Sequence, residues 1–112
     1  MRPRDWDIPE IFYRLYSLSS EEEVLHWCRD FLSEKMEVSF SPRRQDVHSA
    51  RPSQALTSYL LSLTGKIKMD GLANSGDLVM VYGSLQSSPD STKRFAHVWW
   101  LSGKSIVRFE EF

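Results

Sequence analysis

The residue types able to do acid–base chemistry lie near the end of the chain. His97 falls within an apolar run from Arg94 to Leu101, and Glu111 falls within the next run, from Ser105 to Phe112. Gly103 lies between the two runs, in a position typical of a tight hairpin turn, so we expect neighbouring antiparallel strands. His97 and Glu111 can then come within hydrogen-bonding distance. Such a pair orients an imidazole as a general acid or base.

The alternation of side chains along a strand assigns these residues to two faces. One face carries Phe95, His97, Trp99 and Leu101, and the other carries Ala96, Val98 and Trp100. On the last run, Val107, Phe109 and Glu111 alternate with Ile106, Arg108 and Glu110. The predicted ligand-contacting residues are Tyr82, Phe95, Trp99 and Phe109. The predicted subunit-interface residues are Trp100, Ile106 and Arg108.

The same residues have structural interpretations. His97 can be a hydrogen-bonded core histidine, because nothing else in the chain completes a catalytic mechanism. A reversed assignment of the faces would leave Glu111 in solvent. Trp99 is either a flat wall for an aromatic or alicyclic ligand or a core tryptophan, and Tyr82 either offers its hydroxyl to a pocket or packs against neighbours.

Cysteine and histidine usage predicts no metal, cofactor or disulfide. Cys28 is the single cysteine, and its place on an apolar helical stripe indicates a core residue and not a nucleophile. The three histidines give no metal-ligand spacing. A single cysteine and a charged start without a signal-peptide pattern lead us to expect a cytosolic or nuclear protein.

Length and charge restrict the class of protein. A chain of 112 residues fits one domain, residues 1–112, and a formal net charge of −1 argues against binding to nucleic acid. Its 41% hydrophobic and 26% charged residues are typical of a soluble domain, and no apolar run approaches 18 residues, so no membrane partner is expected.

Helical spacing of apolar residues predicts three helices. The first starts near Ile8 and breaks at Ser17 to Ser20. Ser20 and Glu23 form a capping-box pattern that starts the second helix. The third begins at Pro52, which fits a first helical turn, and ends at Gly65.

The remaining segments predict strands. Apolar and polar residues alternate from Met36 to Phe40, which predicts a short strand. The segment from Ser41 to Ser49 indicates a loop or hairpin turn. A further strand around Ile67 is predicted to end at the turn from Asn74 to Gly76. The run Leu78 to Ser84 follows, with a polar loop from Gln86 to Lys93. This order predicts an α+β fold, in which a curved antiparallel sheet of four to five strands packs on two to three helices around a cone-shaped pocket.

This element order, together with the segments GDLVMVYG (residues 76–83), FAHVWW (residues 95–100) and GKSIVRFEEF (residues 103–112), resembles the nuclear transport factor 2-like superfamily. The closest resemblance is to its SnoaL-like branch, which includes polyketide cyclases and plant wound-induced proteins. The resemblance implies a cone-shaped fold that usually dimerises through the outer face of its sheet. It also implies an inward functional position at His97, where isomerases carry an acid, and an acidic position at Glu111. The isomerases' general base would fall near Phe40 to Pro42, where no carboxylate stands.

Three functions therefore remain open. The leading expectation is a non-enzymatic, stress-associated protein that forms a homodimer, as the resemblance implies. Its cone would bind a small apolar or amphipathic molecule or be filled by side chains. The first alternative is a cyclase, isomerase or hydratase that uses His97 and Glu111. The second is a homo- or heterodimeric interaction module, because Trp100 and its neighbours would form an apolar outer surface.

Overall fold

The computed structural model describes residues 7–40, 52–103 and 105–112. Two helices, a strand, a helix and four strands follow one another, as the sequence predicts. The elements are α1 (Ile8–Ser17), α2 (Glu21–Phe31), β1 (Leu32–Ser39), α3 (Pro52–Leu63), β2 (Ile67–Ser75), β3 (Leu78–Ser88), β4 (Ser91–Ser102) and β5 (Ser105–Glu111). The predicted loop at Ser41 to Ser49 lies outside the described residues.

Local capping explains where the first two helices begin. The Asp7 carboxylate accepts a hydrogen bond from the Glu10 amide at 3.2 Å, which caps α1. Ser20 Oγ accepts from the Glu23 amide at 3.2 Å and donates to the Glu23 carboxylate at 3.0 Å, which confirms the capping pattern of α2. Each helix then buries one apolar stripe. The buried residues of α1 are Ile8, Ile11, Phe12, Leu15 and Tyr16, and those of α2 are Val24, Trp27 and Cys28.

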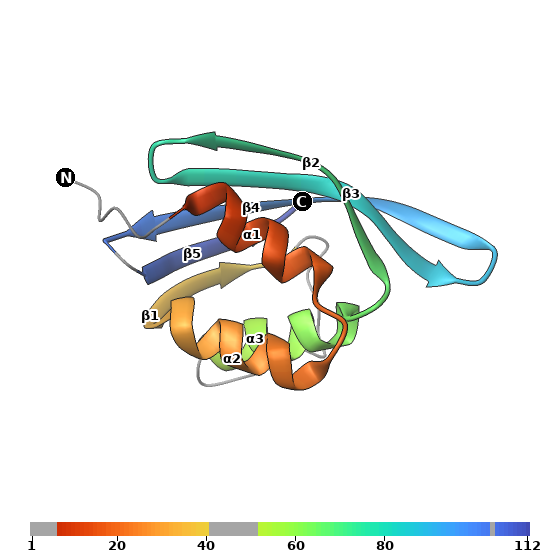
Figure 1. Ribbon diagram of the computed structural model, residues 1–112, viewed down its shortest axis with the longest axis horizontal. Helices are drawn as coiled ribbons and strands as arrows, with labels where there is room; N and C mark the ends of the chain where they lie inside the picture. Colours follow the sequence, from red (N-terminus) through yellow and green to blue (C-terminus); the bar gives the residue numbers. More distant parts are fainter. Residues whose placement is uncertain (1–6, 41–51, 104) are drawn as a thin grey trace.

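All five strands form one sheet, in the order β1-β5-β4-β3-β2. The helices pack on its concave side, with α1 crossing the middle strands and α2 and α3 below (Figure 1). The sheet is mixed, because β1 runs parallel to β5, whereas the sequence predicts an antiparallel sheet. The difference arises because β5 inserts between β1 and β4, so β1 pairs with the strand most distant from it in the chain.

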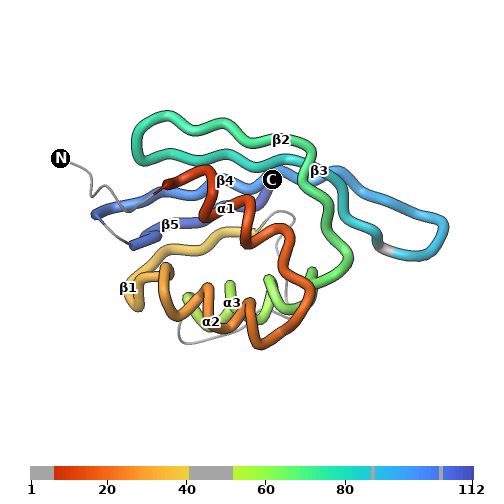
Figure 2. The backbone as a smooth tube through the Cα atoms, in the orientation of Figure 1, coloured from red at the N-terminus to blue at the C-terminus, as the bar shows by residue number. Residues whose placement is uncertain are grey.

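The β3–β4 hairpin is longer than the sequence predicts. The expected polar loop from Gln86 to Lys93 is instead paired strand, with Ser88 opposite Ser91 across a turn at Pro89 and Asp90. This end of the hairpin projects beyond the helices (Figure 2). The described side chains at this end are exposed, so they lack the apolar alternation by which strands are recognised.

Two glycines allow close approach between strands β2 and β3. A Cβ at Gly83 would collide with the backbone carbonyl of Lys68, which cannot turn away. A Cβ at Gly71 would instead meet the end of the Tyr82 side chain, which can move.

We therefore expect Gly83→Ala to destabilise the protein by about 2–3 kcal/mol, because overpacking forces a backbone shift. The matched variant Gly71→Ala should cost less. Urea denaturation of the two variants measures the difference, and equal losses would contradict this account of Gly83.

Candidate functional site

The concave face of β4 forms the wall predicted from the sequence. Phe95, His97, Trp99 and Leu101 are buried, and His97 and Trp99 have no solvent exposure. Aromatic rings from other elements cover this wall. The Trp99 ring centroid lies 4.6 Å from that of Phe109, 5.2 Å from that of Phe12 and 5.8 Å from that of Trp27. Among the described residues, side chains therefore fill the concave side of β4.

A chain of buried hydrogen bonds runs through this wall and joins four elements. Trp99 Nε1 donates to the Tyr16 hydroxyl at 3.2 Å, and that hydroxyl lies 2.6 Å from His97 Nδ1. On the other side of the ring, the Tyr59 hydroxyl lies 3.1 Å from His97 Nε2 and donates to Glu111 Oε2. His97 and Glu111 are direct partners in the β4–β5 register, as predicted. The Tyr59 hydroxyl bridges their side chains.

The donors in this chain fix the direction of three of its four hydrogen bonds. An indole nitrogen can only donate, so the Tyr16 oxygen accepts from Trp99. Tyr59 has one proton and donates it to Glu111 Oε2, so His97 Nε2 donates to the Tyr59 oxygen. The Tyr16 hydroxyl has a second lone pair as well as a proton, so the direction of its hydrogen bond with His97 Nδ1 depends on the protonation of the ring.

Burial also keeps Tyr16 protonated. Desolvation raises the pKa of Tyr16 well above its ordinary value, opposed in part by the hydrogen bond from Trp99 and reinforced by the proximity of Tyr59. A tyrosine with a raised folded-state pKa stabilises the fold below its unfolded value near 10 and loses that contribution as the pH rises above it.

We therefore expect the free energy of unfolding of the wild type to fall between about pH 10 and pH 12, and to fall less in Tyr16→Phe. Urea titrations at each pH measure both slopes. Equal slopes for the two proteins would contradict the assignment of the neutral phenol to Tyr16.

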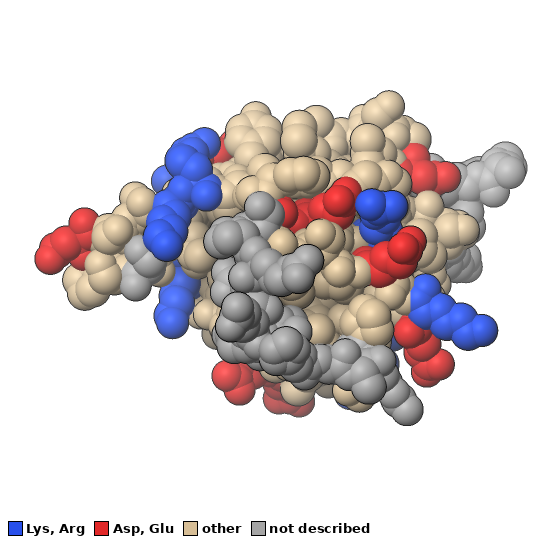
Figure 3. Space-filling model, turned by 180° about the vertical axis from the view of Figure 1, so that it is seen from behind, with Lys and Arg blue, Asp and Glu red and all other residues tan. Residues whose placement is uncertain are grey.

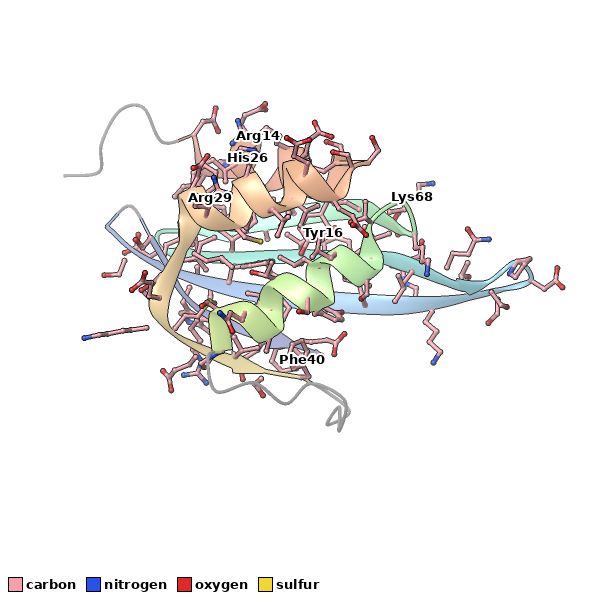
Figure 4. The ribbon with its side chains drawn as sticks, turned by 90° about the horizontal axis from the view of Figure 1, so that it is seen from below. Arg14, Tyr16, His26, Arg29, Phe40 and Lys68 are labelled. Carbon is pink, nitrogen blue, oxygen red and sulfur yellow. The ribbon has the colours of Figure 1, made fainter. Side chains whose placement is uncertain are left out.

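Sequence reasoning found His97 and Glu111 but missed the two tyrosines that connect them. Tyr16 and Tyr59 occupy the apolar stripes of α1 and α3, where helical spacing alone indicates packing residues. The signal that could have found them is the hydroxyl itself, because a buried tyrosine usually needs a hydrogen-bond partner. Figure 4 shows Tyr16 on the side of α1 that faces the sheet and α3.

Two predicted site residues lie on the opposite face from the one expected. Tyr82 is 41% exposed on the outer face of β3, because Val79 and Val81 take the inward positions. Ile106 is fully buried, although it was predicted at the subunit interface. The reason is a bulge in β5: Leu101 pairs with Ile106 and Trp100 with Arg108, so the intervening Val107 is an extra residue that shifts the alternation.

The outer face of the sheet carries an apolar patch, which we call the outer patch. Its residues form adjacent rows across β3 and β4, because Leu78 pairs with Trp100, Met80 with Val98 and Tyr82 with Ala96. Leu78, Met80 and Tyr82 are 38%, 40% and 41% exposed, and their β4 partners are half-buried. Figure 3 shows uncharged areas on the rear of the molecule, with a group of acidic and basic side chains across the middle of the view and basic side chains toward its left side.

Charged residues of both signs border the outer patch. The Arg108 guanidinium carbon lies 5.0 Å from the Trp100 ring centroid, and Arg108 Nη2 lies 3.5 Å from Glu110 Oε1. At the other end, Arg94 Nη1 bonds Asp70 Oδ2 at 2.8 Å. An apolar centre with a polar rim is the usual anatomy of a protein interface.

Cys28 and the metal-binding residue types are the remaining candidates for chemistry. Burial raises the pKa of the Cys28 thiol to about 11, partly offset by a hydrogen bond with Thr57, so the thiol is protonated at neutral pH and is no nucleophile. Among residues 7–40, 52–103 and 105–112, no cluster of His, Cys, Asp or Glu could hold a metal ion, and no helix is long and apolar enough to cross a membrane.

The hollows of the described surface are small or shallow. One cavity of about 20 Å³ lies beside Tyr16 and has mostly aliphatic walls, including Leu15, Leu60 and Ile67. A wider groove of about 440 Å³ separates α2 from the start of α3, with Leu25, Arg29 and Gln54 among its lining residues. The groove is open to solvent and combines apolar with oppositely charged residues, including Glu34.

Comparison with solved structures identifies the fold. A nuclear transport factor 2-like protein from Burkholderia thailandensis is 22% identical, with a TM-score of 0.64 over 92% of this chain and 87% of that one. A putative SnoaL-like polyketide cyclase from Jannaschia is 13% identical, with a TM-score of 0.64 over 98% and 90% of the two chains. A de novo designed protein with a curved β-sheet is 14% identical, with a TM-score of 0.71 over 97% and 85%.

Comparison with protein-family models and with curated proteins found no match. The chain has the nuclear transport factor 2-like fold, which confirms the resemblance at the level of architecture. At these identities, the likeness defines the fold and leaves the function to be argued from the residues.

Proposed function

We propose that this protein is a non-enzymatic interaction module that pairs with a second copy of itself through the outer patch. The observation that carries the proposal is the row of exposed apolar side chains at Leu78, Met80 and Tyr82, each beside an apolar partner on β4. Contiguous apolar side chains on a sheet face are costly to leave in water and mark sites of association.

The charges around the outer patch favour a second copy over a strongly charged partner. Arg108 and Glu110 lie at one margin, and Arg94 and Asp70 lie at another, so each margin carries both signs. A face with balanced charges does not repel its own copy, whereas a partner of one charge sign would meet like charges at each margin. Trp100, with the Arg108 guanidinium over its ring, is the largest aromatic side chain of the outer patch, and tryptophan is enriched among the residues that dominate binding energy at interfaces.

The concave side gives less support to the ligand-binding and enzymatic alternatives. His97 is fully buried and Glu111 is 7% exposed, and the bridging Tyr59 is 4% exposed. A substrate or apolar ligand would have to displace the rings that cover them. The hydrogen bonds among these side chains link the helices to the sheet, so we assign the function to the outer face.

The test is sedimentation of Trp100→Glu beside the wild type. A glutamate in place of Trp100 would lose its hydration when the two copies associate, so we expect association to weaken by at least about 2 kcal/mol, or roughly 30-fold in Kd. The matched control is Lys93→Glu, an exposed change on the projecting hairpin that should leave the dimer intact. A Trp100→Glu dimer as strong as the wild type would remove the proposal.

A further inference from the structure

Tyr82 has a small residue beside it on each neighbouring strand. Its partner on β2 is Gly71, and its partner on β4 is Ala96. Cross-strand partners point to the same face of a sheet, so the size of these two residues decides how much space the ring has. The Tyr82 side chain therefore has room to lean across the outer face.

The ring leans toward β2 and lies over Gly71. A Cβ atom on Gly71 would lie 2.9 Å from Tyr82 Cε1, and still closer to Tyr82 Cζ and to its hydroxyl oxygen. Because a Cβ is the first atom of a side chain, the far end of the phenol lies at the level of the sheet surface. Tyr82 thus lies flat along β2, which is an edge strand, in the way that aromatic residues cover edge glycines.

We propose that Gly71 is a positioning residue of the outer patch: because it has no side chain, the Tyr82 ring is held flat in the free protomer, in the conformation that contacts the second copy. The inference rests on the proposed association. It adds the residue that arranges the surface for that association.

A ring that is fixed before association strengthens binding. A side chain that must be immobilised on binding weakens the complex by roughly 2- to 10-fold in Kd, and a ring already held on the sheet avoids this loss. Tyr82 remains 41% exposed, so the flat ring is open to a partner, and the adjacent Met80 remains 40% exposed beside it.

The direct test is Gly71→Ala, with Kd measured by sedimentation equilibrium. The new Cβ would take the place of the phenol end, and the Tyr82 side chain can rotate away, so the fold is kept while the ring is displaced. We expect Kd of the dimer to rise by roughly 10-fold.

The matched control makes the same substitution where there is no ring to displace. In a Tyr82→Ala background, adding Gly71→Ala should change Kd by no more than about twofold, the limit within which independent effects add. A general effect of alanine on strand β2 would instead weaken both backgrounds equally.

The position of the ring can also be measured without association. In the Trp100→Glu protomer, nuclear Overhauser contacts should join the ring protons of Tyr82 to the Hα protons of Gly71. The absence of these contacts in the folded protomer would overturn the proposed placement.

The outcomes separate the two proposals. A wild-type protein that is monomeric at every concentration would overturn the association and this role with it. A wild-type dimer whose Kd is unchanged by Gly71→Ala, or is changed equally in both backgrounds, would overturn the role of Gly71 alone.

Discussion

Replacement of Trp99 by alanine is expected to cost about 3–5 kcal/mol, the range for removal of a large buried aromatic side chain. Trp99 has no solvent exposure and packs against the rings of Phe12, Trp27 and Phe109. The change also removes the indole donor to Tyr16. Since a domain of this size is stable by about 5–15 kcal/mol, we expect Tm to fall by roughly 15 °C or more.

The neighbouring tryptophan supplies the matched control for this variant. Trp100 points to the outer face and is half-buried, so Trp100→Ala should cost the isolated protomer less than about 1.5 kcal/mol. Calorimetry of both variants at low protein concentration separates the folding effect from association. If the two variants lost equal stability, the assignment of the two faces of β4 would be wrong.

Removal of the Tyr59 hydroxyl is expected to have the second-largest effect. Tyr59→Phe keeps the ring but deletes the donor to the Glu111 carboxylate and the partner of His97 Nε2. A hydrogen bond to a charged group contributes about 1.5–3 kcal/mol and a neutral one about 1 kcal/mol, so we expect a loss of about 2–4 kcal/mol.

The same substitution on the outer face tests whether the loss of stability comes from the buried hydrogen bonds. Tyr82 is 41% exposed, and Tyr82→Phe should change the free energy of unfolding by no more than about 0.5 kcal/mol. Guanidinium titrations of both variants give the comparison. A Tyr59→Phe protein as stable as Tyr82→Phe would show that the bridge between His97 and Glu111 contributes little to the fold.

Local signals made the helices predictable from the sequence. The capping pair Ser20 and Glu23 and the apolar stripes of α1 and α3 act within a few residues, so their spacing carries the information directly. The same holds for the face of β4 that carries His97, because strict alternation there matches the burial pattern of the strand.

Non-local pairing explains what the sequence did not predict. The parallel register of β1 with β5 depends on which strand lies beside which, and the bulge at Val107 depends on how β5 fits β4. That bulge alone moves Ile106 from the outer face to the core. Tyr16 and Tyr59 meet His97 from helices that are 81 and 38 residues away in the chain, a contact that no local pattern records.

These contacts give the two faces of the sheet different roles. The concave face binds its own helices through aromatic packing and through the chain that ends at Glu111. The outer face keeps Leu78, Met80 and Tyr82 exposed. The described residues fill the concave side, and the exposed apolar patch on the other side suits association, which is the basis of our proposed function.

The most direct test of that function is sedimentation equilibrium of the wild-type protein over a range of concentrations. The chain has a mass of 13.1 kDa. We predict a mass twice that of the chain at micromolar concentration, with dissociation on dilution. A single-chain mass at every concentration would contradict the account, and the outer patch would then need another explanation.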